Sequence, residues 1–111
     1  MPTVKYRKGG INVTLEISPA TALMGMERSV LMAEAQKVED EPRATQILHR
    51  AVYPDLVACT VKVEGIEWPL DFEAFARLPD ELVARWERAC YQANPHWAPG
   101  YESEDDAEKK A

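Results

Sequence analysis

The distribution of the large aromatic side chains constrains the fold of this chain most strongly. All three tryptophans and both phenylalanines lie within residues 68–97, WPLDFEAFARLPDELVARWERACYQANPHW. A chain of 111 residues can bury roughly two thirds of its unfolded surface around one core. We therefore expect a single globular domain over residues 1–97, in which the aromatic stretch builds the core and the earlier segments pack against it.

Two helix signals occupy the aromatic stretch. Asp71 is a candidate N-cap for a short helical turn, which ends before Pro79 because the residue preceding a proline is driven out of the helical region. A second helix is predicted over residues 80–93, and its apolar face should be core: Leu82, Val83, Trp86, Ala89, Cys90 and Ala93. Trp68 and Trp97 lie outside these helices, and each is either a lid on the core or an exposed anchor for a partner.

The N-terminal region has the pattern of β-strands. Residues 11–17 alternate apolar and polar side chains directly after Gly9-Gly10, which predicts a strand and favours a hairpin with residues 3–8. The basic run KYRK at residues 5–8 is interpreted as a solvated edge rather than as a docking site for an acidic partner.

A long helix is predicted after this hairpin. It should begin at Ser18-Pro19 and run through Lys37, because a capping hydroxyl followed by proline is a strong start and the run is rich in helix formers. Three apolar residues mark the side expected to be buried: Leu23, Val30 and Leu31. The methionines beside them are either core filler or an adaptable groove for helices: Met24, Met26 and Met32.

A further helix is predicted from Glu41-Pro42 to Tyr53-Pro54. Its apolar face should consist of Ala44, Ile47, Leu48, Ala51 and Val52. His49 lies beside that face and is interpreted as a packed or solvated side chain, since no second ligand stands four residues away to form a metal site. Residues 55–68 are compatible with helix or hairpin, and we predict a short helical turn followed by a small hairpin.

These segments predict an α+β domain that is predominantly helical. It should contain an N-terminal strand or hairpin, three to four helices and a small central hairpin. Residues 98–111 are expected to form an acidic disordered tail, because this segment has few apolar side chains and a cluster of carboxylates.

Charge and cysteine content exclude several classes of function. A formal net charge of -6 argues against a nucleic-acid partner, which requires clustered lysine and arginine. The two cysteines, Cys59 and Cys90, stand in apolar contexts and are expected to be buried free thiols of a reducing compartment. Neither a secretory signal nor an apolar run that could span a bilayer is visible, so we expect a cytoplasmic protein without a membrane partner.

The sequence contains no pattern typical of catalysis. A glycine-rich phosphate loop, a GxSxG elbow, an HExxH pair and a CxxC pair are all missing. Two cysteine–histidine pairs, Cys59 with His49 and Cys90 with His96, are set aside because apolar surroundings keep a thiol protonated. We therefore expect neither an enzyme nor a bound cofactor or metal.

The aromatic stretch and the preceding ILHRAVYP resemble the C-terminal half of the small tail assembly chaperones of long-tailed bacteriophages and prophages. The shared pattern has the form W-P-x-x-F-x-x-F-x-x-L-P-x-x-L-x-x-x-W followed by N-P-x-W. In this chain it falls on Trp68, Pro69, Phe72, Phe75, Leu78, Pro79, Leu82, Trp86, Asn94, Pro95 and Trp97. The resemblance covers about half of the chain and consists of core and turn residues.

The resemblance implies a non-catalytic chaperone that binds the tape-measure protein, a long helical protein, and keeps it soluble during tail assembly. Such a protein acts in the host cytoplasm and is absent from the mature virion. The tail tube protein and a second copy of the chain are further candidate partners, and a longer form made by a frameshift near the end of the reading frame is typical of the family. The candidate residues for the tape-measure groove are Met24, Met26, Trp68, Phe72, Trp86 and Trp97.

Two other functions are kept beside this one. A small acidic binding adaptor or toxin-neutralising protein would present its acidic surface to a basic partner. A small enzyme would depend on Cys90 or His96, and the apolar context of the thiol makes it the weakest of the three hypotheses.

Overall fold

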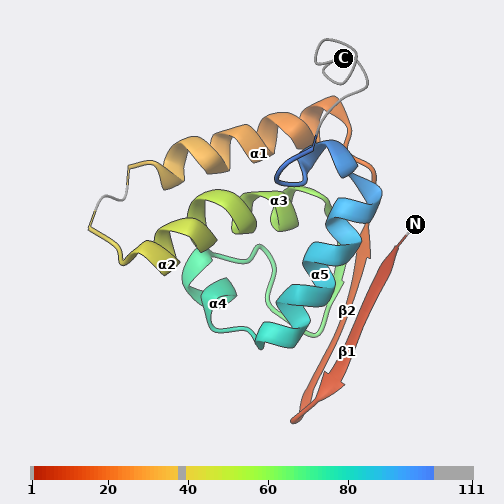
Figure 1. Ribbon diagram of the computed structural model, residues 1–111. Helices are drawn as coiled ribbons and strands as arrows, with labels where there is room; N and C mark the ends of the chain where they lie inside the picture. The colour runs from red at the N-terminus through yellow and green to blue at the C-terminus, as the bar shows by residue number, and fades with distance from the viewer. Residues whose placement is uncertain (1, 38–39, 102–111) are drawn as a thin grey trace.

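The computed structural model describes residues 2–37 and 40–101, and it has an α+β fold, as predicted. A three-stranded antiparallel sheet lies along one side of the domain, α5 packs against the sheet, and α1 crosses the far end of the helical layer (Figure 1). The strands are β1 (Thr3–Lys8), β2 (Ile11–Ile17) and β3 (Thr60–Glu64), in the order β1-β2-β3.

The predicted N-terminal hairpin is confirmed. Gly9 and Gly10 have φ angles of 60° and 82°, and a two-residue hairpin turn with positive φ at both positions matches the twist of the strands that it joins. The inner face of the sheet is apolar and buried, and it consists of Val4, Tyr6, Val13, Leu15 and Ile17.

The predicted central hairpin is wrong, although its first strand exists. β3 pairs with β2, Leu15 opposite Val63, and residues 66–68 form no strand. The chain leaves β3 at Gly65, which has a φ of 94° and lies so close to β2 that a Cβ atom there would be 1.9 Å from the carbonyl oxygen of Asn12. The sheet therefore uses β2 as its central strand.

The helical segments are α1 (Ala22–Ala35), α2 (Arg43–Ile47), α3 (Tyr53–Ala58), α4 (Phe72–Ala76) and α5 (Asp80–Ala93). A π-helical turn, η1 (Leu48–Val52), joins α2 to α3 without a break, and a 3₁₀ turn, η2 (Pro95–Trp97), follows α5. The expected short helix after Asp71 and the expected helix over residues 80–93 are both confirmed, and the Asp71 side chain accepts a hydrogen bond from the backbone N–H of Ala74.

The predicted start of the first helix at Ser18-Pro19 is wrong. Thr21 is the N-cap of α1, and its hydroxyl accepts a hydrogen bond from the backbone N–H of Met24. The preceding residues are held by Asn94, whose side chain is fully buried: its amide oxygen accepts from the N–H of Ala20 at 2.7 Å, and its amide nitrogen donates to the carbonyl of Ser18 at 3.0 Å. A distant residue therefore outweighs the local helix signal.

The second predicted helix continues past Tyr53-Pro54, where it was expected to end. A proline inside a helix lacks the N–H that would bond to the preceding turn. The π-helical turn accommodates this defect, because the N–H of Tyr53 reaches back five residues to the carbonyl of Leu48. Three residues of the predicted apolar face are exposed instead of buried: Ala44, Ile47 and Ala51.

The core is built around Trp86, as the sequence predicted. Its side chain is fully buried, its indole N–H donates to the hydroxyl of Thr60 at 2.9 Å, and its ring meets that of Phe75 edge-on at 5.8 Å. Cys59 and Cys90 are buried and free, as expected. Trp97 is a core residue with only 8% of its surface exposed.

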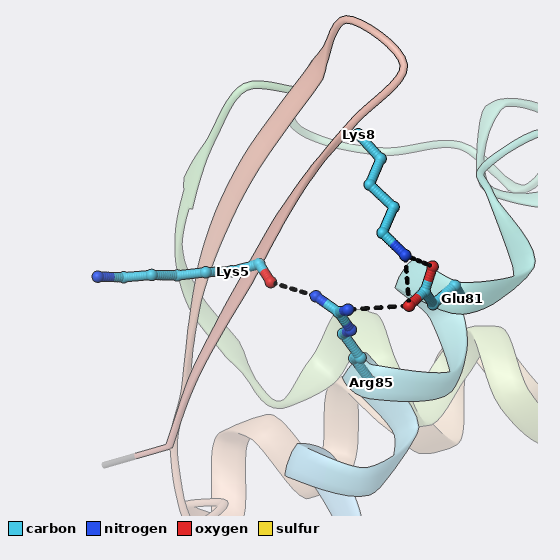
Figure 2. Close-up of polar contacts among 4 residues, drawn as sticks. All are labelled: Lys5, Lys8, Glu81 and Arg85. Atoms are coloured by element: carbon cyan, nitrogen blue, oxygen red, sulfur yellow. Dashed lines mark hydrogen bonds and ion pairs between the residues drawn. The ribbon is translucent and has the colours of Figure 1, made fainter.

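Helix α5 also holds the outer edge of β1 (Figure 2). Lys8 pairs with Glu81 at 2.7 Å, and Arg85 bridges the same carboxylate to the backbone carbonyl of Lys5, at 2.9 Å in each case. The hydrogen bond from Lys8 is the main reason why the pKa of Glu81 is lowered. The basic run is therefore partly engaged with α5, while the side chains of Lys5 and Arg7 remain exposed, as expected of a solvated edge.

The predicted acidic tail over residues 98–111 falls mostly on residues 102–111, which lie outside the described residues. Its first part forms a turn, in which the N–H of Tyr101 donates to the carbonyl of Ala98 at 3.1 Å. Among the described residues, no helix has the length and apolar composition that crossing a bilayer requires.

Candidate functional site

Helix α1 differs from the other long helix in having apolar side chains on both of its sides. Its sequence, ALMGMERSVLMAEA, contains only four polar side chains: Glu27, Arg28, Ser29 and Glu34. A helix that is apolar all round is normally covered all round. In this domain one side of α1 packs on α3 and η1, and the other side faces outward.

The side of α1 that faces the core is selected by an ion pair. Asp55 of α3 is only 3% exposed, and its carboxylate is bound by Arg28 of α1 at 2.5 Å and by the hydroxyl of Tyr91 of α5 at 2.8 Å. The guanidinium of Arg28 also lies 4.9 Å from the centre of the Trp97 ring. A buried carboxylate needs such partners, so Arg28 has to point inward and fixes the rotation of α1.

This rotation turns Leu23, Met26 and Val30 toward solvent. Their exposed fractions are 69%, 63% and 51%, respectively. Their spacing of three and four residues places them on one stripe of the helix, which we call the α1 outer face. The expectation that Leu23 and Val30 mark the buried side is therefore wrong, whereas Leu31 is partly buried against the core as expected.

The α1 outer face has an acidic rim. Met26 and Val30 line a shallow depression of about 370 Å³ together with Leu31 and two carboxylates, Glu27 and Glu34. Both carboxylates are exposed. The site thus combines an apolar stripe with negative charge along one side, which is complementary to an amphipathic helix that carries lysine or arginine beside its own apolar stripe.

The six residues expected to form one groove do not come together. Met26 belongs to the α1 outer face, whereas Met24 is half-buried on the same helix. Trp86 and Trp97 are buried in the core and cannot line a groove in this structure. Trp68 is 40% exposed and lies over Trp86, with a distance of 6.5 Å between the ring centres.

Phe72 is half-buried and belongs to an aromatic cluster with His49 and Tyr53. His49 stacks on its ring at 3.9 Å, and Tyr53 meets it edge-on at 5.6 Å. The Nδ1 atom of His49 lies 3.5 Å from the carboxylate of Glu41. His49 is therefore a packed side chain, as predicted, and this cluster serves as scaffold.

The arrangement of the thiols does not resemble a nucleophilic site. The hydrogen bond with Cys59 and burial both raise the pKa of Cys90 far above that of an ordinary thiol. The histidines considered as their partners are elsewhere: His49 stacks on Phe72, and His96 lies beside Trp97. Within residues 2–37 and 40–101, no group of three or more histidine, cysteine, aspartate or glutamate residues is placed to hold a metal ion.

Sequence reasoning missed two of the three residues of the α1 outer face. The available signal was the near absence of polar residues from this helix, which leaves no solvated side. When compared with models of protein families, with characterised proteins and with solved structures, the chain matches none of them.

Proposed function

We propose that this protein is a non-catalytic tail assembly chaperone of a long-tailed bacteriophage or prophage, which binds the tape-measure protein in the host cytoplasm and keeps it soluble until the tail tube forms. The observation that carries the proposal is the α1 outer face, three large apolar side chains that lie exposed on one stripe of a single helix. The sequence resemblance of residues 47–97 supplies the partner.

The chemistry of the α1 outer face suits a long helical partner. A tape-measure helix exposes apolar stripes that aggregate in water, and the stripe of Leu23, Met26 and Val30 is a complementary surface at helical spacing. Glu27 and Glu34 favour a partner with basic residues along its stripe and repel one with acidic residues.

The small size of the site also fits a chaperone that is later displaced. Fully burying a leucine, methionine or valine side chain contributes about 1.5–3 kcal/mol of binding free energy. The loss of translational and rotational freedom on association costs several kcal/mol. The three exposed side chains of the α1 outer face therefore support only weak binding per copy. Many copies along a long helix would protect it while remaining displaceable by the tube protein.

Co-expression with the tape-measure protein of the same phage tests the proposal. The wild-type chain should keep that protein in the soluble fraction and elute with it, whereas Val30→Asp and Met26→Asp should lose both effects, because each places a charge in the apolar stripe. Ala84→Asp is the matched control, since it adds the same charge at an exposed position of α5 and should bind like the wild type.

The proposal fails if the tape-measure protein remains insoluble with the wild-type chain, or if Val30→Asp and Ala84→Asp have equal effects. Retention of a short basic protein in place of the tape measure would instead favour the small acidic adaptor or toxin-neutralising protein.

A further inference from the structure

The two edge strands of the sheet, β1 and β3, differ in their contacts with the rest of the domain. The outer edge of β1 carries the charged side chains of Lys5 and Arg7. The guanidinium of Arg85 of α5 donates a hydrogen bond to the backbone carbonyl of Lys5. Charges and a covering helix are devices that prevent an edge strand from pairing with another chain. The edge formed by β1 is therefore closed to strand addition.

No hydrogen bond from a helix side chain to the backbone of β3 is found among the described residues, and the two exposed charged side chains of β3, Lys62 and Glu64, have opposite signs. β3 is the last strand of the sheet, and in Figure 2 it forms the outer border of the sheet beyond the hairpin of β1 and β2. Within the described parts of the chain, no backbone hydrogen bond links Val61, Lys62 or Val63 to a segment other than β2. Val61 is 50% exposed, and β3 alternates apolar and charged side chains, TVKVE, as a pairing strand does.

We propose that β3 pairs with β3 of a second copy of this chain, so that two sheets join into one continuous antiparallel sheet. The twofold axis would pass through Val63, perpendicular to the sheet. This dimer is independent of the proposed chaperone function, because β3 and the α1 outer face are different surfaces of the domain.

Charge complementarity indicates that the strand that pairs with β3 is β3 of a second copy, and that the twofold axis passes through Val63. With the axis at Val63, Lys62 of each copy stands opposite Glu64 of the other, which gives two favourable cross-strand pairs. With the axis at Lys62, two lysines would stand opposite each other, which is unfavourable. An axis between two residues would place inner-face side chains opposite outer-face ones, and the sheet excludes that arrangement.

The side chains that would form these pairs are available for them. Lys62 and Glu64 are 60% and 63% exposed, and the ion pair that they make within one copy is long, at 3.7 Å. An exposed pair of this kind contributes little to the stability of the monomer. Pairing with the second copy would replace it by contacts directly across the new strand pair.

Sedimentation over a wide concentration range tests the dimer. The wild type should associate reversibly, and Lys62→Glu should raise the dissociation constant by about tenfold, since two attractive cross-strand pairs become repulsive. The double variant Lys62→Glu with Glu64→Lys should restore association. Lys5→Glu makes the same charge change at the closed edge and should leave association unchanged.

The double variant also separates the contact between copies from strain within one copy. Glu16 of β2 lies opposite Lys62, so both variants carry the same repulsion with Glu16. The double variant also restores an opposite-charge pair between positions 62 and 64 of one copy, but that pair is exposed and long, at 3.7 Å in the wild type, and contributes little. Recovery of the dimer in the double variant therefore reports on the pairing between copies. A chain that stays monomeric at all concentrations, or association that is indifferent to Lys62→Glu, overturns the proposal.

Crosslinking tests the register. In the proposed pairing the two Val63 side chains are cross-strand neighbours, with Cβ atoms about 4.5–5.5 Å apart, whereas the two Val61 side chains are separated by about 13 Å along the strands. A short thiol-to-thiol crosslinker should therefore link copies of Val63→Cys and fail with Val61→Cys and with the wild type, whose two cysteines are buried. Linkage of Val61→Cys in preference to Val63→Cys would contradict this register.

Discussion

Individual buried side chains hold this domain in one arrangement. Trp86 is fully buried between the sheet and the helices, and it meets both the hydroxyl of Thr60 and the ring of Phe75. Asp55 is nearly as buried, and it is bound from two helices at once. These residues determine the fold because a close-packed core can accommodate a large ring in few positions, and a buried charge must lie beside its partners.

Truncating Trp86 should therefore cost most of the stability of the domain. Trp86→Ala is expected to lower the free energy of unfolding by about 3–5 kcal/mol, as for other buried aromatic residues. Trp68→Ala is the control, because the Trp68 side chain is 40% exposed and should cost much less. Urea denaturation measures both, and equal losses for the two variants would contradict the placement of the core at Trp86.

Tyr91 should make stability depend on pH in the alkaline range. Burial, the hydrogen bond to Asp55 and the nearby negative charges raise the pKa of Tyr91 well above its ordinary value of 10.0. The folded state therefore retains a proton that the unfolded chain releases, so the contribution of Tyr91 is complete below pH 10.0 and is lost as the pH rises further.

The variant Tyr91→Phe isolates this contribution. It should be less stable than the wild type at pH 8, because a hydrogen bond to a charged acceptor is lost, and the difference should shrink between pH 10 and pH 12. Denaturant titrations of both proteins across this range measure the difference. A difference that stays constant or grows with pH would show that the Tyr91 hydroxyl is not held by Asp55.

At the scale of elements, the contrast between α5 and α1 decides what the molecule presents to solvent. α5 has one apolar and one polar face, and its buried residues are Leu82, Trp86, Ala89 and Cys90. α1 has apolar residues on both sides, and the pair of Arg28 with Asp55 determines which side is covered. The α1 outer face is thus a consequence of a polar contact in the core.

Breaking that pair should destabilise the docking of α1. Arg28→Leu is expected to cost about 3 kcal/mol, at the lower end for buried ion pairs because Arg28 keeps 24% of its side chain exposed. Adding Asp55→Asn should recover part of the loss, since no buried charge is then left without its partner. Thermal unfolding of the single and double variants measures this, and a double variant that is less stable than Arg28→Leu would contradict the account.

The difference between α5 and α1 also explains which elements could be predicted from the sequence. The start, the end and the buried face of α5 are encoded within its own residues, so they were predicted correctly. The start and the rotation of α1 depend on Asn94 and Asp55, which are 74 and 27 residues away from the groups that they bind. Local alternation likewise identified β3 as a strand, but it contained no information that β2 would be its partner.

At the scale of the whole molecule, two surfaces of the described residues are the ones for which we propose partners. One is the α1 outer face of Leu23, Met26 and Val30, and the other is the free edge of β3. The first suits a helix and the second suits a strand, so they can be occupied at the same time. A dimer joined through β3 would present two α1 outer faces, and two weak sites on one assembly hold a long partner more tightly than either does alone.

The most direct measurement of the central claim uses the methionine methyl groups as probes. Met26 is 63% exposed on the α1 outer face, while Met24 and Met32 are half-buried on the same helix. On addition of a soluble helical segment of the tape-measure protein, the methyl resonance of Met26, assigned through its loss in Met26→Leu, should shift or broaden more than those of Met24 and Met32. Binding of that segment with an unchanged Met26 resonance would show that the tape measure docks elsewhere and that the account is wrong.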